Sequence, residues 1–143
     1  GDLVYKLLSA LIGILITVML VFNGTLSKNT GNYSSIVIIH ITGLICISFI
    51  LLIKKIRINF TNNIPIYLYS AGAIGVFTVL LNNLSFNYIG ASLTLALGLF
   101  GQSITSIVID HFGLLGADVY KFRKQKLIGL IIITLGIVIM TVY

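Results

Sequence analysis

The sequence predicts an all-α membrane protein with five transmembrane helices, folded as a single transmembrane domain over residues 1–143. Composition predicts the membrane class, because 58% of the residues are hydrophobic and only 8% are charged, whereas about 25% of the residues in a typical soluble domain are charged. The mean hydropathy of +1.14 agrees with this class. The apolar residues also gather in runs of about 20, which is the length that crosses a hydrocarbon core of roughly 30 Å.

Short polar segments separate the five apolar runs. The first run is too long for the apolar core of a secretory signal peptide, so we count it as a span. Pro65 opens the third run, at a position that the first turn of a helix tolerates. All seven tyrosines fall at or beyond an expected helix end, where amphipathic rings prefer to lie. The polar segments are SKNTGN, KKIRINFTNN, NYIG and GADVYKFRKQK. The expected spans cover about residues 3–26, 33–53, 65–86, 91–115 and 127–143.

The basic residues predict the orientation of the helices. With five spans, the amino terminus and two of the connections share one side of the membrane, and only Lys28 lies on the other side. Because cytoplasmic loops are enriched in Lys and Arg, we expect the amino terminus in the cytoplasm and the carboxy terminus outside. The net charge of +6 then anchors the chain to the lipid bilayer, and no nucleic-acid partner is expected. The basic residues on the cytoplasmic side are Lys6, Lys54, Lys55, Arg57, Lys121, Arg123, Lys124 and Lys126.

The fourth expected span carries polar side chains on one half of its surface. At about 100° per residue, Gln102, Ser106 and Asp110 fall on one arc with several small residues, and bulky apolar residues occupy the opposite arc. Hydroxyl groups such as that of Ser106 pack membrane helices together at about 1 kcal/mol or less each. Gln102 lies about 16 Å deep in its span, and its amide needs partners there. Packing and contact with a substrate remain alternatives for Gln102.

Asp110 is the most costly of these side chains. It lies within an apolar span and near the carboxy terminus of a helix, where the helix dipole disfavours negative charge. One interpretation is structural, either a cap of the following turn or a local ion pair with Lys121, Arg123 or Lys124. The other interpretation is a carboxylate that exchanges protons or binds a cation.

Four further polar residues lie near the outer ends of the first three spans, at similar depth. They are Asn23 in the first span, His40 in the second, and Asn82 and Asn83 in the third. His40 either titrates in the physiological range or serves as a hydrogen-bonded packing residue. We expect Asn23, His40 and Asn82 to line one cavity together with Gln102.

Four stretches of the chain resemble a known family. They are FNGTL at 22–26, SSIVIIHITGLI at 34–45, AGAIGVFTVLLNNLSFNYIGASLTLALGLFGQ at 71–102 and IDHFGLLG at 109–116. The chain resembles the YdcZ-type inner-membrane exporters of the drug/metabolite transporter superfamily. The most specific part is the Gly-Gln pair that ends at Gln102, followed seven residues later by Ile-Asp-His-Phe-Gly. One departure is Phe22, which precedes Asn23 where the family often has a glutamine.

The resemblance implies half of an inverted-repeat transporter, multi-pass in the inner membrane of a bacterium. In the wider superfamily such halves pair with an inverted copy and place the substrate between them near the midplane. Small multidrug-resistance relatives bind cations and protons through a glutamate in the first helix, but this chain contains no glutamate, so that mechanism does not transfer. Because the basic residues divide eight to one, we expect a heterodimer with a homologous chain of opposite orientation, and a homodimer stays open.

We therefore expect a subunit of a secondary transporter for a small organic metabolite or cation. The alternative is a non-transporting membrane scaffold or accessory subunit, in which the same groups only hold helices together. An enzyme is not expected, because no nucleophile and base set and no metal-ligand spacing is apparent, and neither a metal nor a cofactor is expected. Asp110 is the candidate proton or cation site, and the candidate substrate contacts are Gln102, His40, Asn82, Asn23 and Ser106.

Overall fold

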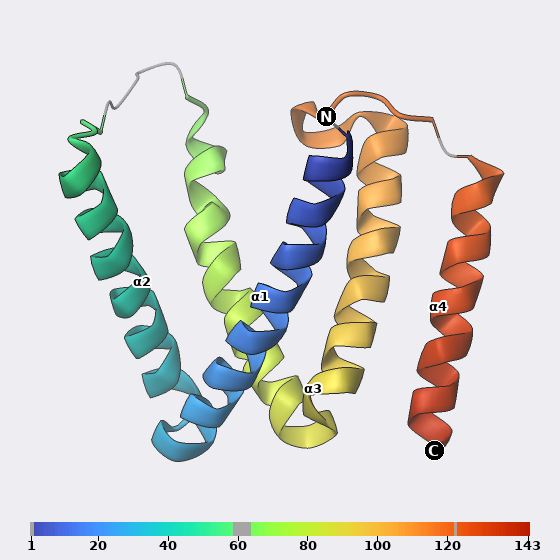
Figure 1. Ribbon diagram of the computed structural model, residues 1–143, viewed down its shortest axis with the longest axis horizontal. Helices are drawn as coiled ribbons and strands as arrows, with labels where there is room; N and C mark the ends of the chain where they lie inside the picture. The colour runs from blue at the N-terminus through green and yellow to red at the C-terminus, as the bar shows by residue number, and fades with distance from the viewer. Residues whose placement is uncertain (1, 59–63, 122) are drawn as a thin grey trace. The chain divides into compact units, whose positions relative to one another are not determined.

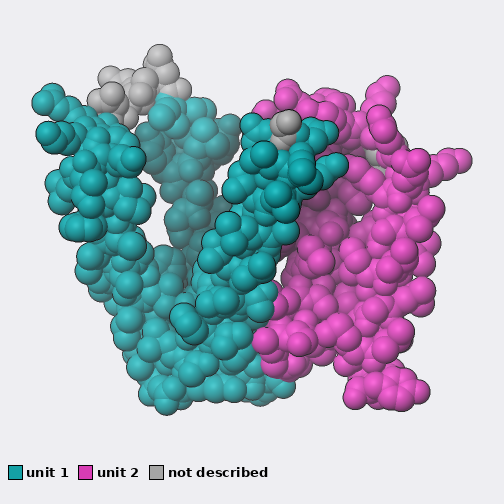
Figure 2. All heavy atoms as spheres, in the orientation of Figure 1, with its two compact units in different colours: residues 1–88 teal, residues 89–143 magenta. Residues whose placement is uncertain are grey.

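The computed structural model describes residues 2–58, 64–121 and 123–143, and this part of the chain contains helices and no strand. It divides into two compact units, residues 1–88 and 89–143, which Figure 2 colours separately. In chain order (Figure 1) the elements are α1 (Asp2–Thr30), α2 (Asn32–Lys54), η1 (Ile66–Ser70), α3 (Ala71–Phe112), η2 (Leu114–Gly116) and α4 (Lys124–Val142).

Four helical segments of the described chain are long and apolar enough to cross a membrane. Their large hydrophobic side chains are mostly exposed, whereas the buried hydrophobic residues found there are Leu20 and Ile36. An exposed apolar surface of this extent is typical of helices that lipid covers. The expected class, an all-α membrane protein, is thereby confirmed. The four segments are Asp2–Thr30, Asn32–Lys54, Ile66–Phe112 and Lys124–Val142.

In the unit of residues 1–88, α1 and α2 contact each other and run in opposite directions (Figure 1). The expected first span ends at residue 26, but α1 continues to Thr30. The side chains of Asn29 and Thr30 donate hydrogen bonds to main-chain carbonyls one turn earlier, at 2.8 and 2.9 Å, so the polar end of the helix remains helical. The apolar run therefore predicted only the part of α1 that suits the hydrocarbon core. The polar last turn of the helix lies outside that run.

Two other helices begin at residues that differ from the expected ones. Pro65 has φ −55° and ψ 133°, so it precedes the short 3₁₀ helix η1, and α3 begins only at Ala71. The last helix, α4, begins at Lys124 rather than at residue 127. Lys and Gln are good helix formers, so α4 extends beyond its apolar run.

The segment NYIG, expected as a break, is helical as far as Ile89. Gly90 alone departs from helical geometry, with φ 77° and ψ 179°, and the helix resumes after it. These angles lie in a region that only glycine adopts readily. The helical segment of 47 residues from Ile66 to Phe112 therefore has one non-helical residue inside α3, at Gly90.

In the unit of residues 89–143, the last part of α3 ends at Phe112, three residues earlier than expected. Gly113 takes a left-handed conformation with φ 61°, which is a common way for a helix to end. A Cβ atom on Gly113 would lie 2.7 Å from Val119 Cγ2, so the following connection packs closely against it. The main-chain N–H of Tyr120 donates to the carbonyl of Asp110 at 2.8 Å and holds this connection over the helix end.

Candidate functional site

A buried cluster of amide and hydroxyl side chains joins α1, α2 and α3 in the unit of residues 1–88. Asn83 and Ser35 are 0% exposed, and Ser27 is 3% exposed. Asn83 Nδ2 donates to Ser35 Oγ at 3.3 Å, and Asn87 Nδ2 donates to Ser27 Oγ at 3.1 Å. The same nitrogen of Asn87 lies 3.4 Å from Asn32 Oδ1. We call these five residues the amide cluster.

Two acceptors of the amide cluster lack a donor. The hydroxyls of Ser27 and Ser35 already donate to main-chain carbonyls one turn earlier, at 2.9 and 2.8 Å. Neither hydroxyl therefore has a proton left to donate to the asparagine side chains. The carbonyl oxygens Asn83 Oδ1 and Asn87 Oδ1 are buried without a hydrogen-bond partner. Leaving a buried polar atom unsatisfied costs about 1–3 kcal/mol. A ligand with an N–H or O–H group could therefore donate a hydrogen bond to each oxygen and remove this cost.

Helix geometry explains why these residues meet. Asn83 and Asn87 are four residues apart in α3, so they lie on one face of that helix, one turn apart. Ser27 ends the buried part of α1 and Ser35 begins that of α2, on either side of the α1–α2 connection. The amide cluster has no ionisable side chain, so it suits a hydrogen-bond donor better than it suits an anion.

Close packing of α1 on α3 holds the amide cluster together. Gly24 is buried in α1, and a Cβ atom there would collide with the ring of Phe86. The ammonium of Lys28 lies 5.0 Å from the centroid of the same ring, which is a cation–π arrangement. Because Gly24 has no side chain, the Phe86 ring lies directly against α1, one turn from Ser27.

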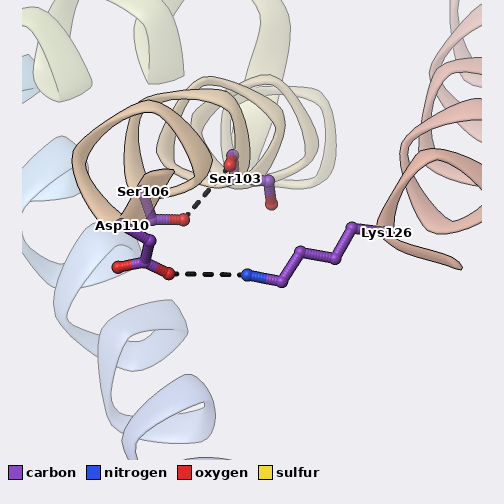
Figure 3. Close-up of polar contacts among 4 residues, drawn as sticks. All are labelled: Ser103, Ser106, Asp110 and Lys126. Carbon is purple, nitrogen blue, oxygen red and sulfur yellow. Dashed lines mark hydrogen bonds and ion pairs between the residues drawn. The ribbon is translucent and has the colours of Figure 1, made fainter. Parts of the chain in front are cut away.

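A second polar site lies between α3 and α4 in the unit of residues 89–143 (Figure 3). Lys126 extends from α4 and places its Nζ 3.5 Å from Asp110 Oδ2, with the two side chains 41% and 36% exposed. Ser106 and Ser103 precede Asp110 by about one and two turns of α3, and their hydroxyls donate to main-chain carbonyls of α3.

The two serines line a cavity of about 270 Å³ between α3 and α4, which we call the serine crevice. Its polar groups are the Ser103 and Ser106 hydroxyls and the Lys126 ammonium, and the rest of its lining is apolar. The lining residues are Ser103, Ser106, Ile107, Lys126, Gly129, Leu130 and Ile133.

The residues predicted to contact a substrate lie in both units. Gln102 is exposed on α3, its side-chain amide makes no hydrogen bond within the described part of the chain, and it does not line the serine crevice. His40, Asn82 and Asn23 are half-buried in the unit of residues 1–88. The His40 Nδ1 atom lies 2.8 Å from the carbonyl oxygen of Ile36 in the same helix. None of these three takes part in the hydrogen bonds of the amide cluster.

Most of the amide cluster was not predicted from the sequence. Asn82 and Asn83 were both expected near this end of the span, and Asn82 was the expected cavity contact. One residue along a helix is a rotation of about 100°, and Asn83 is the buried amide. The available signal was the four-residue spacing of Asn83 and Asn87. That signal was hidden because Asn87 opens the NYIG segment, which the sequence predicts as a break.

The predicted partners of Asp110 were wrong, although an ion pair with the same basic segment is present. Asp110 pairs with Lys126 rather than with Lys121, Arg123 or Lys124. Lys126 lies in the first turn of α4, which begins at Lys124, and the two lysines point about 200° apart around the helix. Because the apolar run of this helix begins only at residue 127, both lysines were expected in a loop.

Together these features define a multi-pass membrane protein whose polar side chains are held between helices. The chain belongs to the family described as "Putative inner membrane exporter, YdcZ", whose family model matches residues 4–139. It is accordingly a multi-pass protein of the inner membrane, and its family is described as one of inner-membrane exporters. A search of curated proteins and a search of solved structures each found no match.

Proposed function

We propose that the chain is a subunit of a drug/metabolite-type secondary transporter that moves a small organic metabolite or cation across the membrane. The family description supports this role and favours export. The observation that carries the proposal is the pair of buried carbonyl oxygens, Asn83 Oδ1 and Asn87 Oδ1. Polar atoms without partners are costly inside a membrane bundle and mark substrate pathways there. A substrate that carries ammonium, amide or hydroxyl donors would satisfy both oxygens.

The proposal includes five membrane crossings with the amino terminus in the cytoplasm. A continuous helix of 47 residues is about 70 Å long, more than twice the thickness of a hydrocarbon core. The non-helical backbone at Gly90 supports division of residues 66–112 into two crossings. The eight-to-one division of basic residues supports the orientation.

A partner chain completes the transporter in this proposal. Gln102 remains exposed on α3, and an amide at that depth needs a partner. A homologous half of opposite orientation would supply one in a heterodimer, because a chain with such unequal loop charge is not expected to insert both ways. A homodimer is the other arrangement.

Asp110 is the candidate proton or cation site of this transporter. Its carboxylate already holds the Lys126 ammonium at 3.5 Å, so a cationic substrate or a proton that replaces Lys126 exchanges one positive charge for another. Ser106 lies one turn away in the serine crevice, where it would accompany such a cation. We propose His40, Asn82 and Asn23 as further contacts along the path.

A membrane scaffold is the competing function, and one observation favours it. The hydrogen bonds from Asn83 to Ser35 and from Asn87 to Ser27 connect three helices, which is what packing interactions alone would do. The two functions differ in what happens to the unsatisfied oxygens, since only a transporter brings a ligand to them.

A thermal-stabilisation screen of small metabolites on the purified full chain, with any partner it retains, tests the proposal. A ligand at 100 times its Kd stabilises its target by about 2.7 kcal/mol. We expect a hit to lose this effect in the Asn83→Leu and Asn87→Leu variants, which keep side-chain size and remove the amide. The control is Asn29→Leu, because Asn29 is exposed and bonds only within α1.

The same hits then enter a flux assay in vesicles. Hits that are transported by the wild-type chain and not by the Asn83→Leu variant support the proposed site. Hits that stabilise all variants equally would place the substrate elsewhere. A chain that assembles normally but transports no hit would favour the scaffold.

A further inference from the structure

A second cavity lies at the polar end of the α3–α4 pair, and its lining is strongly basic. It measures about 460 Å³ and contains three cationic side chains, Lys121, Arg123 and Lys126, against the single carboxylate of Asp110. That carboxylate is engaged by Lys126 at 3.5 Å, which leaves the cations of Lys121 and Arg123 without an acidic partner in this cavity. We call it the basic cavity. Val119 and Tyr120 complete its lining.

The backbone around the basic cavity also favours an anion. Helix α4 begins there without a side-chain cap and without an acidic residue in its first turn, so its first N–H groups add positive potential to that of the lysines. The connection that carries Lys121 is held in place by the main-chain hydrogen bond from Tyr120 to Asp110 at 2.8 Å. Lys121 therefore directly follows backbone that is fixed to the end of α3.

The basic cavity adjoins the apolar serine crevice, since Lys126 lines both. From Lys126 the crevice follows α4 past Gly129 and Leu130 to Ile133, a distance of about 10 Å along the helix axis. The two serine hydroxyls in it already donate to main-chain carbonyls. A positively charged entrance thus leads into a mainly apolar crevice directed into the membrane.

We propose that these two cavities form a binding site for an anionic phospholipid, with its phosphate group in the basic cavity and part of one acyl chain in the serine crevice. A phosphate ester matches the excess positive charge, and basic pockets between membrane helices bind such headgroups. A soluble phosphate would fill the basic cavity but leave the apolar crevice without an occupant. A zwitterionic lipid would fill the crevice but add no net charge to match the cations. The site shares Asp110, Lys126 and the serine crevice with the proposed proton or cation site, but it has no residue in common with the amide cluster, so its test measures the unfolding temperature and not transport.

Titration of the purified full chain with dioleoylphosphatidylglycerol in neutral detergent tests the site, with the unfolding temperature as readout. We expect saturable stabilisation, and much less with dioleoylphosphatidylcholine. The Lys121→Gln/Arg123→Gln double variant should require a lipid concentration roughly tenfold higher for half of the effect. The Lys54→Gln/Lys55→Gln variant removes the same charge from the end of α2 and should titrate as wild type. Equal responses to both lipids, or equal losses in both double variants, would overturn the proposal.

Two further arms test the headgroup and the acyl chain separately. Asp110→Asn removes the only acidic group that lines the basic cavity, so it should lower the lipid concentration needed, by a few-fold. Gly129→Leu should fill the crevice, because a Cβ atom there has nothing within 4 Å. In the wild-type chain, the long-chain dioleoyl lipid should raise the unfolding temperature more than the short-chain dihexanoylphosphatidylglycerol does. Gly129→Leu should abolish this difference, whereas Gly136→Leu, which lies outside the crevice lining, should keep it. Full stabilisation by glycerol 3-phosphate alone would instead assign the site to a soluble anion.

Discussion

At the residue scale, the contrast between Asn82 and Asn83 shows how strongly a membrane helix distinguishes adjacent positions. Asn83 is completely buried and bonded to Ser35, while Asn82 is half-buried and lies outside the amide cluster. The sequence indicated that amides are concentrated near this end of the span. It did not indicate which amide faces α1 and α2, because the direction of a helix face is decided by packing such as that of Phe86 on Gly24.

The contact between Gly24 and Phe86 gives a prediction for a single residue. Gly24→Ala should lower the free energy of unfolding by about 1–3 kcal/mol, because the added methyl group overpacks the ring. Thermal unfolding of the purified chain measures this loss. Gly13→Ala in the same helix, where a Cβ has nothing within 4 Å, should cost little.

A double-mutant cycle separates this contact from other effects of the alanine. Adding Phe86→Leu to Gly24→Ala should recover part of the lost stability, because the two positions touch and their effects are coupled. Strictly additive losses would contradict direct contact between the two positions.

At the element scale, α3 is the least regular helix in the described chain. Sequence analysis predicted a break near residue 90 from the NYIG segment, and the structure reduces that break to Gly90 alone. Asn87 is thereby kept in helical register with Asn83, and both reach the amide cluster. A conventional loop over NYIG would have removed Asn87 from this face.

The backbone conformation of Gly90 predicts that a substitution at this position lowers the stability of the chain. Gly90→Ala should destabilise the chain by about 1–3 kcal/mol, because φ 77° with ψ 179° is strained for any residue with a Cβ. Gly75→Ala, within α3, should be neutral or stabilising, since alanine is the better helix former and a Cβ there has nothing within 4 Å. Chemical or thermal unfolding compares the stability of the Gly90→Ala and Gly75→Ala variants. A Gly90→Ala variant as stable as the wild type would contradict the observed backbone geometry.

At the scale of the whole molecule, composition and apolar runs were sufficient to predict a helical membrane protein, because these properties depend on total hydropathy and length. Most helix bounds were close. The largest difference is at the start of α3, which begins at Ala71 rather than at Pro65, and polar residues extend α1 to Thr30 and α4 back to Lys124. The site was harder to predict. Its hydrogen bonds connect residues 48 and 60 positions apart, and no local pattern encodes such contacts.

The proposed topology makes a prediction for the complete chain. An alkaline phosphatase fused after Tyr143 should be active, because five crossings from a cytoplasmic amino terminus place the carboxy terminus outside, where its disulfides form. A fusion after Asp118 should be inactive, since the proposed topology puts the connection before α4 in the cytoplasm. If Ile66–Phe112 crossed only once, the fusion after Tyr143 would report the cytoplasm.

Gly31 is the only residue between α1 and α2, and so short a link restricts how the pair can move. Two Cα–Cα steps of 3.80 Å span less than about 8 Å, so the adjoining helix ends stay at one depth and neither helix slides past the other. Their far ends have no such tether. Any rearrangement of these helices therefore pivots at Gly31, beside the amide cluster, and opens widest at the opposite face of the membrane.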